Sequence, residues 1–281
     1  MPHPPAHLLR TGHALLMATH PGPAAAVTAL AAGLCRSAHL PRARAVAVVG
    51  AVGSGQLLIG WSNDLIDVRR DRLTDRLDKP VARGEVSPRA VARAAAGACA
   101  LNLVASRALG GRAALTQLAT VASGLAHNLG VKGTWASPAP YAIAFGLLPS
   151  VVTLALPQPA LAPRATTVGA ALLGVGAHLV NALPDLEDDR ATGVPGLPHR
   201  LGEGVSRLLV GSTLAASSFV LALDRRPLGR AERTVLAASL ALAGAAARDR
   251  GRGRGALAAV VGIAAIDLAL LGASLTEETD A

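Results

Sequence analysis

Residues 44–61 read RAVAVVGAVGSGQLLIGW and run directly into SNDLIDVRRD at 62–71. The first stretch holds one charged residue, Arg44, in 18 positions, so as a helix it is long and apolar enough to cross the hydrocarbon core of a bilayer. Comparable stretches recur along the chain and predict an all-α, polytopic membrane bundle of about nine transmembrane helices. The predicted spans are 21–38, 44–61, 89–107, 113–130, 139–157, 165–183, 205–223, 231–247 and 255–274.

The composition supports a membrane protein and argues against other classes. Only 16% of the 281 residues are charged and 51% are apolar, against about 25% charged residues in an average soluble domain. The net charge of +9 would suit nucleic acid, but no basic run is interleaved with aromatic residues, and arginines lie between the apolar stretches. Cys35 and Cys99 lie in apolar stretches, which excludes a disulfide scaffold. Residues 1–20 lack the continuous apolar core of a signal peptide and are predicted to form an interfacial lead-in.

Acidic residues concentrate in two segments that lie far apart in the sequence. Segments 63–85 and 185–203 hold eleven of the 18 Asp and Glu residues, and nine spans place both segments on one face of the membrane. Outside the spans this face carries sixteen Lys and Arg residues against ten on the other, which predicts that it is the cytoplasmic face of a multi-pass cell-membrane protein. We expect one transmembrane domain, 1–281, in which 62–88 and 184–204 are acidic cytoplasmic active-site loops.

The first acidic segment places its polar side chains on one face of a helix. With Asn63 at zero and about 100° per residue, Asp64, Asp67 and Asp71 fall at roughly 100°, roughly 40° and roughly 80°. Gln56 falls at about 20° and extends the polar stripe into the span. Carboxylates this close together repel one another unless a cation lies among them, and hard oxygen ligands suit Mg²⁺. The motif therefore predicts a magnesium site.

The residues around this motif allow two interpretations. In the simpler one, the motif is a solvated helix end whose charge is neutralised by nearby arginines, which are Arg69, Arg70, Arg72 and Arg76. In the other, Lys79 and Arg83 supply cations from a loop that contains Pro and Gly, and such a loop is suited to binding diphosphate oxygens.

The second acidic segment repeats the pattern at the end of a later span. With Asn181 at zero, Asp185 falls at about 40°, Asp189 at about 80° and His178 at about 60°. These positions hold for the acids provided that the helix tolerates Pro184. The arrangement places an imidazole one turn deeper in the membrane than the acids. A histidine inside a span is more often a packing or hydrogen-bonding residue, and both interpretations of His178 stay open.

These motifs resemble those of a known family. The pattern at 63–71 looks like the first Asp-rich motif of the UbiA-type intramembrane aromatic prenyltransferases, a group that includes 4-hydroxybenzoate polyprenyltransferase, and the pattern at 185–189 resembles the second. Residues 79–87 resemble the family's loop after its second helix, and the predicted span count matches its nine helices. The resemblance covers nearly the whole chain. It implies an all-α bundle around a central cavity open to the bilayer, with Mg²⁺ bridging the acidic motifs to a prenyl diphosphate.

The resemblance also assigns roles to residues of this chain. The metal ligands it implies are Asn63, Asp64, Asp67, Asp71, Asp185 and Asp189. The catalytic residues it implies are Asp64, Asp67, Asp71, Asp185 and Asp189, with His178 as a candidate base. The diphosphate-binding residues it implies are Asn63, Arg69, Lys79, Arg83 and Lys132. The acceptor and prenyl pocket is expected to include Gln56, Asn128 and Asn181.

Two positions depart from the family pattern. The second motif usually begins with an Asp where this chain has Ala182, so one ligand is missing. The family often has a Tyr four residues before the lysine that corresponds to Lys132, and Asn128 stands there, preceded by His127. Losing that phenol affects acceptor chemistry more than diphosphate binding. The chain's one tyrosine, Tyr141, lies in the next predicted span.

The resemblance implies Mg²⁺-dependent transfer of a prenyl group from an allylic prenyl diphosphate to an aromatic or similar acceptor, with release of diphosphate. A terpene cyclase of the same family ranks lower, because 2% aromatic residues offer few rings to steer a cation. A membrane cation transporter is suggested by Asp267 inside the last span, although both acidic clusters lie at span ends rather than at the midplane. A non-catalytic homologue is suggested by Ala182 and Asn128. Acceptor, prenyl length and oligomeric state stay open.

Overall fold

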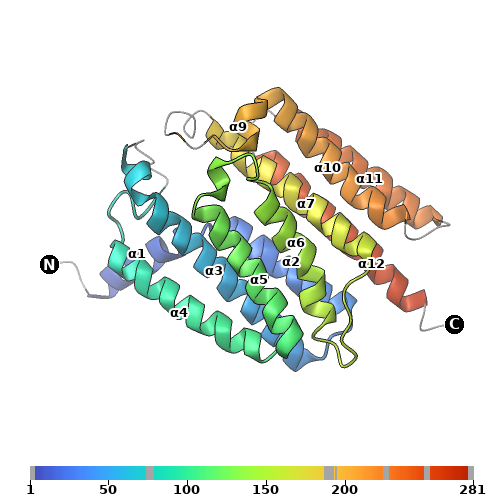
Figure 1. The fold of residues 1–281 in the computed structure, drawn as a ribbon, viewed down its shortest axis with the longest axis horizontal. Coiled ribbons are helices and arrows are strands. Elements are labelled where there is room, and N and C mark those ends of the chain that lie inside the picture. The colour runs from blue at the N-terminus through green and yellow to red at the C-terminus, as the bar shows by residue number, and fades with distance from the viewer. Residues whose placement is uncertain are drawn as a thin grey trace.

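The computed structural model describes residues 4–73, 79–186, 193, 195–223, 228–249 and 254–277; of these, the side chains of 4–9, 185, 231, 254 and 269–277 are not described. In the described part every regular element is helical, which confirms the predicted all-α class (Figure 1). The helices are α1 (Pro4–Met17), α2 (Pro21–Ser37), α3 (Arg42–Leu73), α4 (Pro88–Arg107), α5 (Gly111–Asn128), η1 (Val131–Gly133), α6 (Ala139–Thr153), α7 (Arg164–Ala182), η2 (Leu183–Asp185), α9 (Leu197–Leu201), α10 (Glu203–Leu223), α11 (Arg230–Arg248) and α12 (Arg254–Glu277).

Each of the nine predicted spans coincides with one of these helices. Fewer of these helices are long and apolar enough to cross a membrane. In the described part, α3, α7 and α10 are long and apolar enough. Residues 10–17 and α2 would make a fourth span if the pair, bent by 67°, crosses as one. Helix α6 and residues 255–268 of α12 are apolar but shorter. The count of nine spans therefore stays a prediction.

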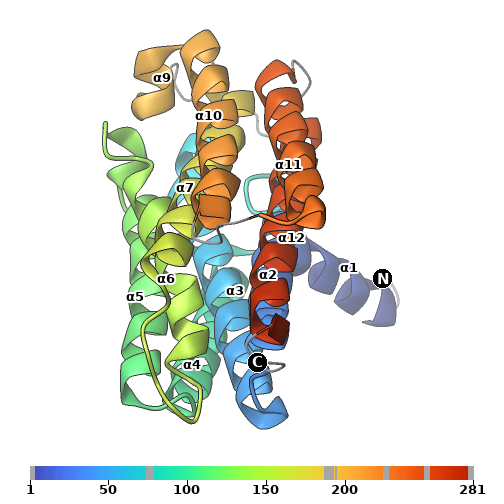
Figure 2. The ribbon, with the colours of Figure 1, turned by 90° about the vertical axis from the view of Figure 1, so that its right-hand side faces the viewer.

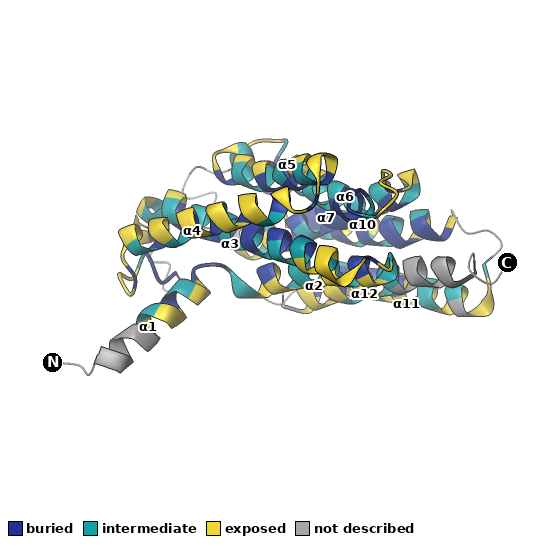
Figure 3. Ribbon diagram, turned by 90° about the horizontal axis from the view of Figure 1, so that it is seen from below, coloured by how far each residue is buried: buried dark blue, intermediate teal, exposed yellow. Residues whose placement is uncertain are grey.

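The long helices run side by side in a bundle, and α1 projects away from it (Figure 2). Helix α3 packs against α2, α4 and α5, while α7 packs between α6 and α10. Exposed residues lie along the outward faces of the helices (Figure 3). Large apolar side chains are among them, as expected where a bundle meets lipid; Val104 on α4 and Leu115 on α5 are examples.

Glycine allows the chain before α2 to lie directly on α3. A Cβ atom at Gly60 would collide with the backbone carbonyl of Thr19, so this contact needs a residue without a side chain. The contact holds the break between α1 and α2 beside the part of α3 that carries the acids. The lead-in predicted at 1–20 contains α1 and this break.

Helix α3 is longer than the predicted span. It continues to Leu73, so the segment 62–88, predicted as a loop, begins as helix. The chain then turns through 79–87 into α4, and Pro88 occupies the first turn of that helix. The Ser87 side chain accepts a hydrogen bond from Ala90 N at 3.2 Å. This N-cap fixes the far end of the turn that carries Lys79.

Asp267, which suggested an ion path, lies in a closed polar contact between helices. Its carboxylate accepts hydrogen bonds from Ser217 Oγ at 2.9 Å and Ser218 Oγ at 2.5 Å, and Ser218 also contacts Ser239 Oγ at 2.5 Å. All four residues are buried. The group therefore links α12 to α10 and α11, which is a structural role for the buried acid.

Candidate active site

The acids of the first motif share one buried face of α3. Asp64, Asp67 and Asp71 are 1%, 5% and 3% exposed. Ile66 and Arg69 are exposed on the other side of the helix. This is the face that the helical spacing predicts. Three carboxylates buried along two turns need cationic partners, because an isolated buried charge is costly.

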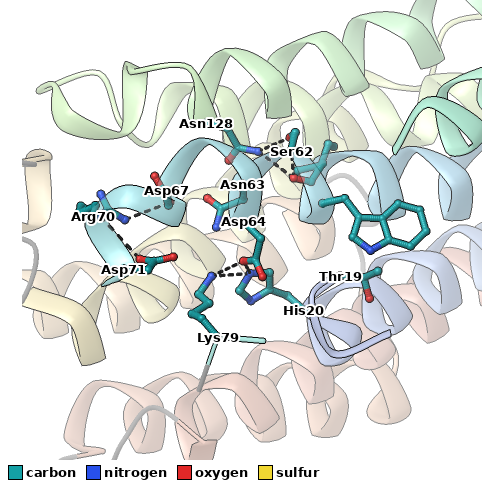
Figure 4. Close-up of polar contacts among 12 residues, drawn as sticks. Thr19, His20, Ser62, Asn63, Asp64, Asp67, Arg70, Asp71, Lys79 and Asn128 are labelled. Carbon is teal, nitrogen blue, oxygen red and sulfur yellow. Dashed lines mark hydrogen bonds and ion pairs between the residues drawn. The ribbon is translucent and has the colours of Figure 1, made fainter. Parts of the chain in front are cut away.

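Asp64 meets two cationic or ionisable groups from other parts of the chain. Lys79 Nζ donates to Asp64 Oδ1 at 2.6 Å, and His20 Nε2 lies 3.1 Å from the same oxygen and 2.9 Å from Lys79 Nζ (Figure 4). His20 occupies the break between α1 and α2 with φ 55°. Sequence reasoning missed His20, because the contact spans 44 residues and no local periodicity links its two ends. The only cue was that a buried carboxylate needs a partner.

The other oxygen of Asp64 is the feature that best fits a metal ion. Asp64 Oδ2 is buried and has no hydrogen-bond partner among the residues that the structure describes. Asn63, Asp67 and Asp71 lie on the same helix, and their amide and carboxylate oxygens are hard ligands of the kind that Mg²⁺ prefers. Among the described residues, however, no three Asp, Glu, His or Cys side chains converge closely enough to hold an ion. The side chain of Asp185 and all of Asp189, the second-motif candidates, lie outside what the structure describes.

Asp67 is paired with cations from two directions. Lys132, in η1 after α5, places Nζ 2.5 Å from Asp67 Oδ2 and 3.4 Å from Asn63 Oδ1. Arg70 donates to Asp67 Oδ2 at 3.0 Å, and its Nε lies 4.0 Å from Asp71 Oδ1. The first motif and Lys132 therefore meet in one cluster.

The structure does not bring two of the predicted diphosphate-binding residues to this cluster. Arg69 is exposed, and Arg83 pairs with Glu85 at 2.8 Å in an exposed turn. Arg70 stands with the acids instead. The helical spacing indicates Arg70 rather than Arg69, because Arg70 falls at about −20° from Asn63 and Arg69 at about 240°.

A cavity of about 370 Å³ lies beside the part of α3 that precedes the acidic cluster, with Gln56 and Ile59 in its wall, and its volume is within the range of small-molecule sites, about 300–1,000 Å³. Apolar side chains make most of its wall, and the predicted pocket residues Gln56, Asn128 and Asn181 also line it. Asn128 Nδ2 donates to Ser62 Oγ and to the Ile59 carbonyl, both at 2.9 Å, and this fixes the amide against α3 (Figure 4). The apolar residues of the wall include Ala26, Val27, Leu30, Ile59, Ala144, Phe145, Leu173, Val260, Ala264 and Leu268.

Four rings gather at one side of this cavity. The ring centroid of Tyr141 lies 5.1 Å from those of both His127 and His178, and its ring is near-parallel to that of Phe145 at 6.4 Å. His127, Tyr141 and Phe145 are part of the cavity wall. His178 is buried behind Tyr141, with Nε2 3.1 Å from Ser137 Oγ. His178, a candidate base, is therefore not itself part of the cavity wall.

The sequence matches the model of the UbiA prenyltransferase family over residues 21–255. The chain therefore belongs to the UbiA prenyltransferase family, a membrane-embedded family, and it is a prenyltransferase. No curated protein matches the chain.

Solved structures have the same fold. A UbiA homologue from Archaeoglobus fulgidus bound to GPP and Mg²⁺ is 19% identical with a TM-score of 0.71, covering 94% of this chain and 99% of that one. The apo structure of a UbiA homologue from Aeropyrum pernix K1 is 16% identical with a TM-score of 0.72, covering 94% and 98%. A structure of digeranylgeranylglyceryl phosphate synthase is 14% identical with a TM-score of 0.63 and covers 95% of both chains. At these identities the likeness establishes the fold.

Proposed function

We propose that this chain uses Mg²⁺ to transfer the prenyl group of an allylic prenyl diphosphate to an aromatic acceptor, with 4-hydroxybenzoate as the first candidate. The observation that carries the proposal is the continuity of one face of α3. Gln56 and Ile59 line the apolar cavity, and Asn63 and Asp67 follow on the polar side. Four residues of helix advance about 6 Å, so a molecule with an apolar tail and an anionic head fits across the junction.

Cationic side chains at this junction suit a diphosphate. Lys79, Lys132 and Arg70 hold their charged groups at the acids, and they can move their hydrogen bonds to diphosphate oxygens as negative charge develops on the leaving group. Asn63, Asp64, Asp67 and Asp71, with Asp185 and Asp189, are the residues proposed to hold Mg²⁺. Bound there, the ion would supply Lewis-acid stabilisation of the leaving diphosphate.

The apolar wall of the cavity supports the second half of the reaction. An allylic cation reacts readily with water, and a cavity lined by Ala, Val and Leu side chains keeps water away from it. The comparisons support the choice of donor, since two structures of the Archaeoglobus fulgidus homologue, 19% and 18% identical, are bound to GPP and Mg²⁺ and to DMAPP and Mg²⁺.

The arrangement in the membrane is part of the proposal. We infer one domain over 1–281 in the cell membrane, with the acidic segments 62–88 and 184–204 on the cytoplasmic face. The excess of cations outside the predicted spans on that face supports this orientation. Labelling of an introduced cysteine at Arg69 from the cytoplasmic side only is the expected result, and labelling from outside only would reverse the orientation.

The test is diphosphate release by the purified protein in detergent, from geranyl diphosphate and longer donors, with Mg²⁺ or with EDTA. Acceptors are 4-hydroxybenzoate, a naphthoate, a chlorin alcohol and a sugar phosphate. Release that needs both Mg²⁺ and an aromatic acceptor supports the proposal. Release that needs another acceptor corrects the acceptor class, and no release under any condition contradicts the proposal. Asp67→Asn is expected to abolish release, while Asp267→Asn serves as a matched buried control.

One observation favours a terpene cyclase as the second candidate. Aromatic residues are few in the chain, but Tyr141 and Phe145 both lie in the cavity wall, where rings can steer a cation. A cyclase would release diphosphate from the donor alone and yield a cyclic hydrocarbon or alcohol. The assay without acceptor therefore separates the two candidates.

A further inference from the structure

The reactive carbon of a bound donor can be located from the two ends of the site. If the diphosphate lies at Asn63, Asp67 and Lys132 and the tail lies in the apolar cavity, the allylic carbon that leaves the diphosphate lies at the rim between them. This step depends on the proposed function. Asn128 marks the rim, because it lines the cavity and also hydrogen-bonds Ser62, the residue before Asn63 (Figure 4).

Tyr141 lies at this rim and is held there by its neighbours. The His127 ring, next to Asn128 on α5, meets it in an edge arrangement at 81°, and the His178 ring is tilted by 52° against it. On α7, a Cβ atom at Gly174 would collide with the Tyr141 carbonyl and with Phe145, so the glycine lets α7 press directly against this part of α6. The Tyr141 hydroxyl makes only a long polar contact, at 3.5 Å, with Asn181 Nδ2 among the described residues. The ring, rather than the hydroxyl, is therefore the feature that this packing positions.

We propose that Tyr141 stabilises the allylic cation through the face of its ring. The C1–O bond of the donor breaks, both electrons leave with the diphosphate, and the positive charge spreads over C1 and C3. A ring carbon of the acceptor then supplies the electron pair for the new bond to C1, and its proton passes to the released diphosphate. No bond forms to Tyr141, whose π electrons lower the energy of the cation by electrostatic attraction.

The size of the effect follows from desolvation. A cation over an aromatic face gains more where water is excluded, and the cavity wall around Tyr141 is mostly apolar. We expect Tyr141→Leu to lower kcat by about 10- to 100-fold with little change in KM for the donor. Tyr141→Phe keeps the ring and should stay within about threefold of the unchanged protein. The fraction of prenyl alcohol, formed when water captures the cation, should rise in Tyr141→Leu.

A fluorinated series separates a cation-stabilising ring from a packing ring. Phenylalanines with one, two and three fluorines at position 141 have nearly equal size but progressively weaker π faces. We expect log kcat to fall steadily along the series. The same series at position 219, a phenylalanine that is exposed on α10 and is not part of the cavity wall, is the matched control and should show a flat response. Equal kcat across the series at 141 would overturn the proposal.

A binding experiment keeps this inference separate from the proposed function. The probes are an ammonium analogue of the geranyl cation with inorganic diphosphate and Mg²⁺, and the neutral-tailed geranyl thiodiphosphate with Mg²⁺. Tyr141→Leu should bind the ammonium analogue about tenfold more weakly and the thiodiphosphate unchanged. If both probes bind the variant as they bind the unchanged protein, the role of Tyr141 is wrong and the proposed function stands. If neither binds the unchanged protein, the proposed function itself fails.

Discussion

Lys132 Nζ lies 2.7 Å from Asp67 Oδ1, although the two residues are 65 positions apart. Helix α5 packs against α3 and delivers η1 to the acidic face of α3. A short charge-assisted pair of this kind holds both side chains in place in a largely buried setting. In the proposed function, Lys132 would bind the diphosphate and Asp67 would bind the metal ion.

Lys132→Ala tests whether this lysine binds the donor. Loss of a hydrogen bond to a charged group costs about 1.5–3 kcal/mol, so KM for the prenyl diphosphate should rise about 10- to 100-fold. Steady-state kinetics with geranyl diphosphate measures the change. Arg89→Ala, an exposed cation at the start of α4, is the control and should leave KM unchanged. An unaltered KM in Lys132→Ala would remove this residue from the site.

Lys79 is predicted to stabilise the fold through Asp64. Removing one partner of a buried ion pair costs about 3–5 kcal/mol, because the other charge stays buried. Lys79→Met should therefore lower Tm in detergent by about 10 °C. Adding Asp64→Asn removes the stranded charge and should restore most of the loss. A double variant no more stable than Lys79→Met would show that the pair does not act as a unit.

Gly60→Ala and Gly97→Ala are two matched variants that test helix packing. Gly60→Ala should strongly destabilise the protein, because the added methyl group would collide with the backbone at Thr19 and push the His20 segment off α3. Gly97→Ala on α4 meets nothing within 4 Å and should be neutral or stabilising by up to about 1 kcal/mol, as alanine favours helix. Thermal unfolding in detergent measures both. Equal Tm values for the two variants would refute the close contact.

Asp267 is expected to matter for stability and not for turnover. Asp267→Ala removes one acceptor from each of the Ser217 and Ser218 hydroxyls, which should cost about 1–3 kcal/mol and lower Tm by several degrees. Asp267→Asn keeps an acceptor oxygen and should lose less. Full loss of activity in Asp267→Asn, with an unchanged Tm, would instead favour an ion path through this residue.

The helical repeat in the sequence predicts which side chains of one helix share a face, but not how distant helices pack. The spacing of Asp64, Asp67 and Asp71 placed their side chains on one face of α3, and the structure has them there, buried. Lys132 could be assigned to the site because its position corresponds to a lysine of the family's pattern. His20 and Tyr141 could not be assigned to the site, because each depends on how distant helices pack. A histidine before α2 becomes a partner of Asp64 only after Gly60 lets the chain lie on α3.

The number of membrane spans does not follow from apolar stretches alone. Apolar stretches located the helices well, since helix formation and apolar composition go together in a bundle. Whether each helix crosses the bilayer depends on its length and on the polar residues that it carries. In the described part, α3, α7 and α10 each meet both conditions as single helices. Within α3 the resemblance implied Arg69 as a diphosphate-binding residue, whereas Arg70 is the arginine that faces the acids.

We propose that the acidic face of α3 binds a prenyl diphosphate together with Mg²⁺. Calorimetric titration of geranyl thiodiphosphate, which resists C–O cleavage, measures this binding without turnover. We predict binding with Mg²⁺ that is lost in EDTA, and at least about tenfold weaker binding in Asp67→Asn, with Asp267→Asn unchanged. Equally tight binding in EDTA, or in Asp67→Asn, would contradict the claim.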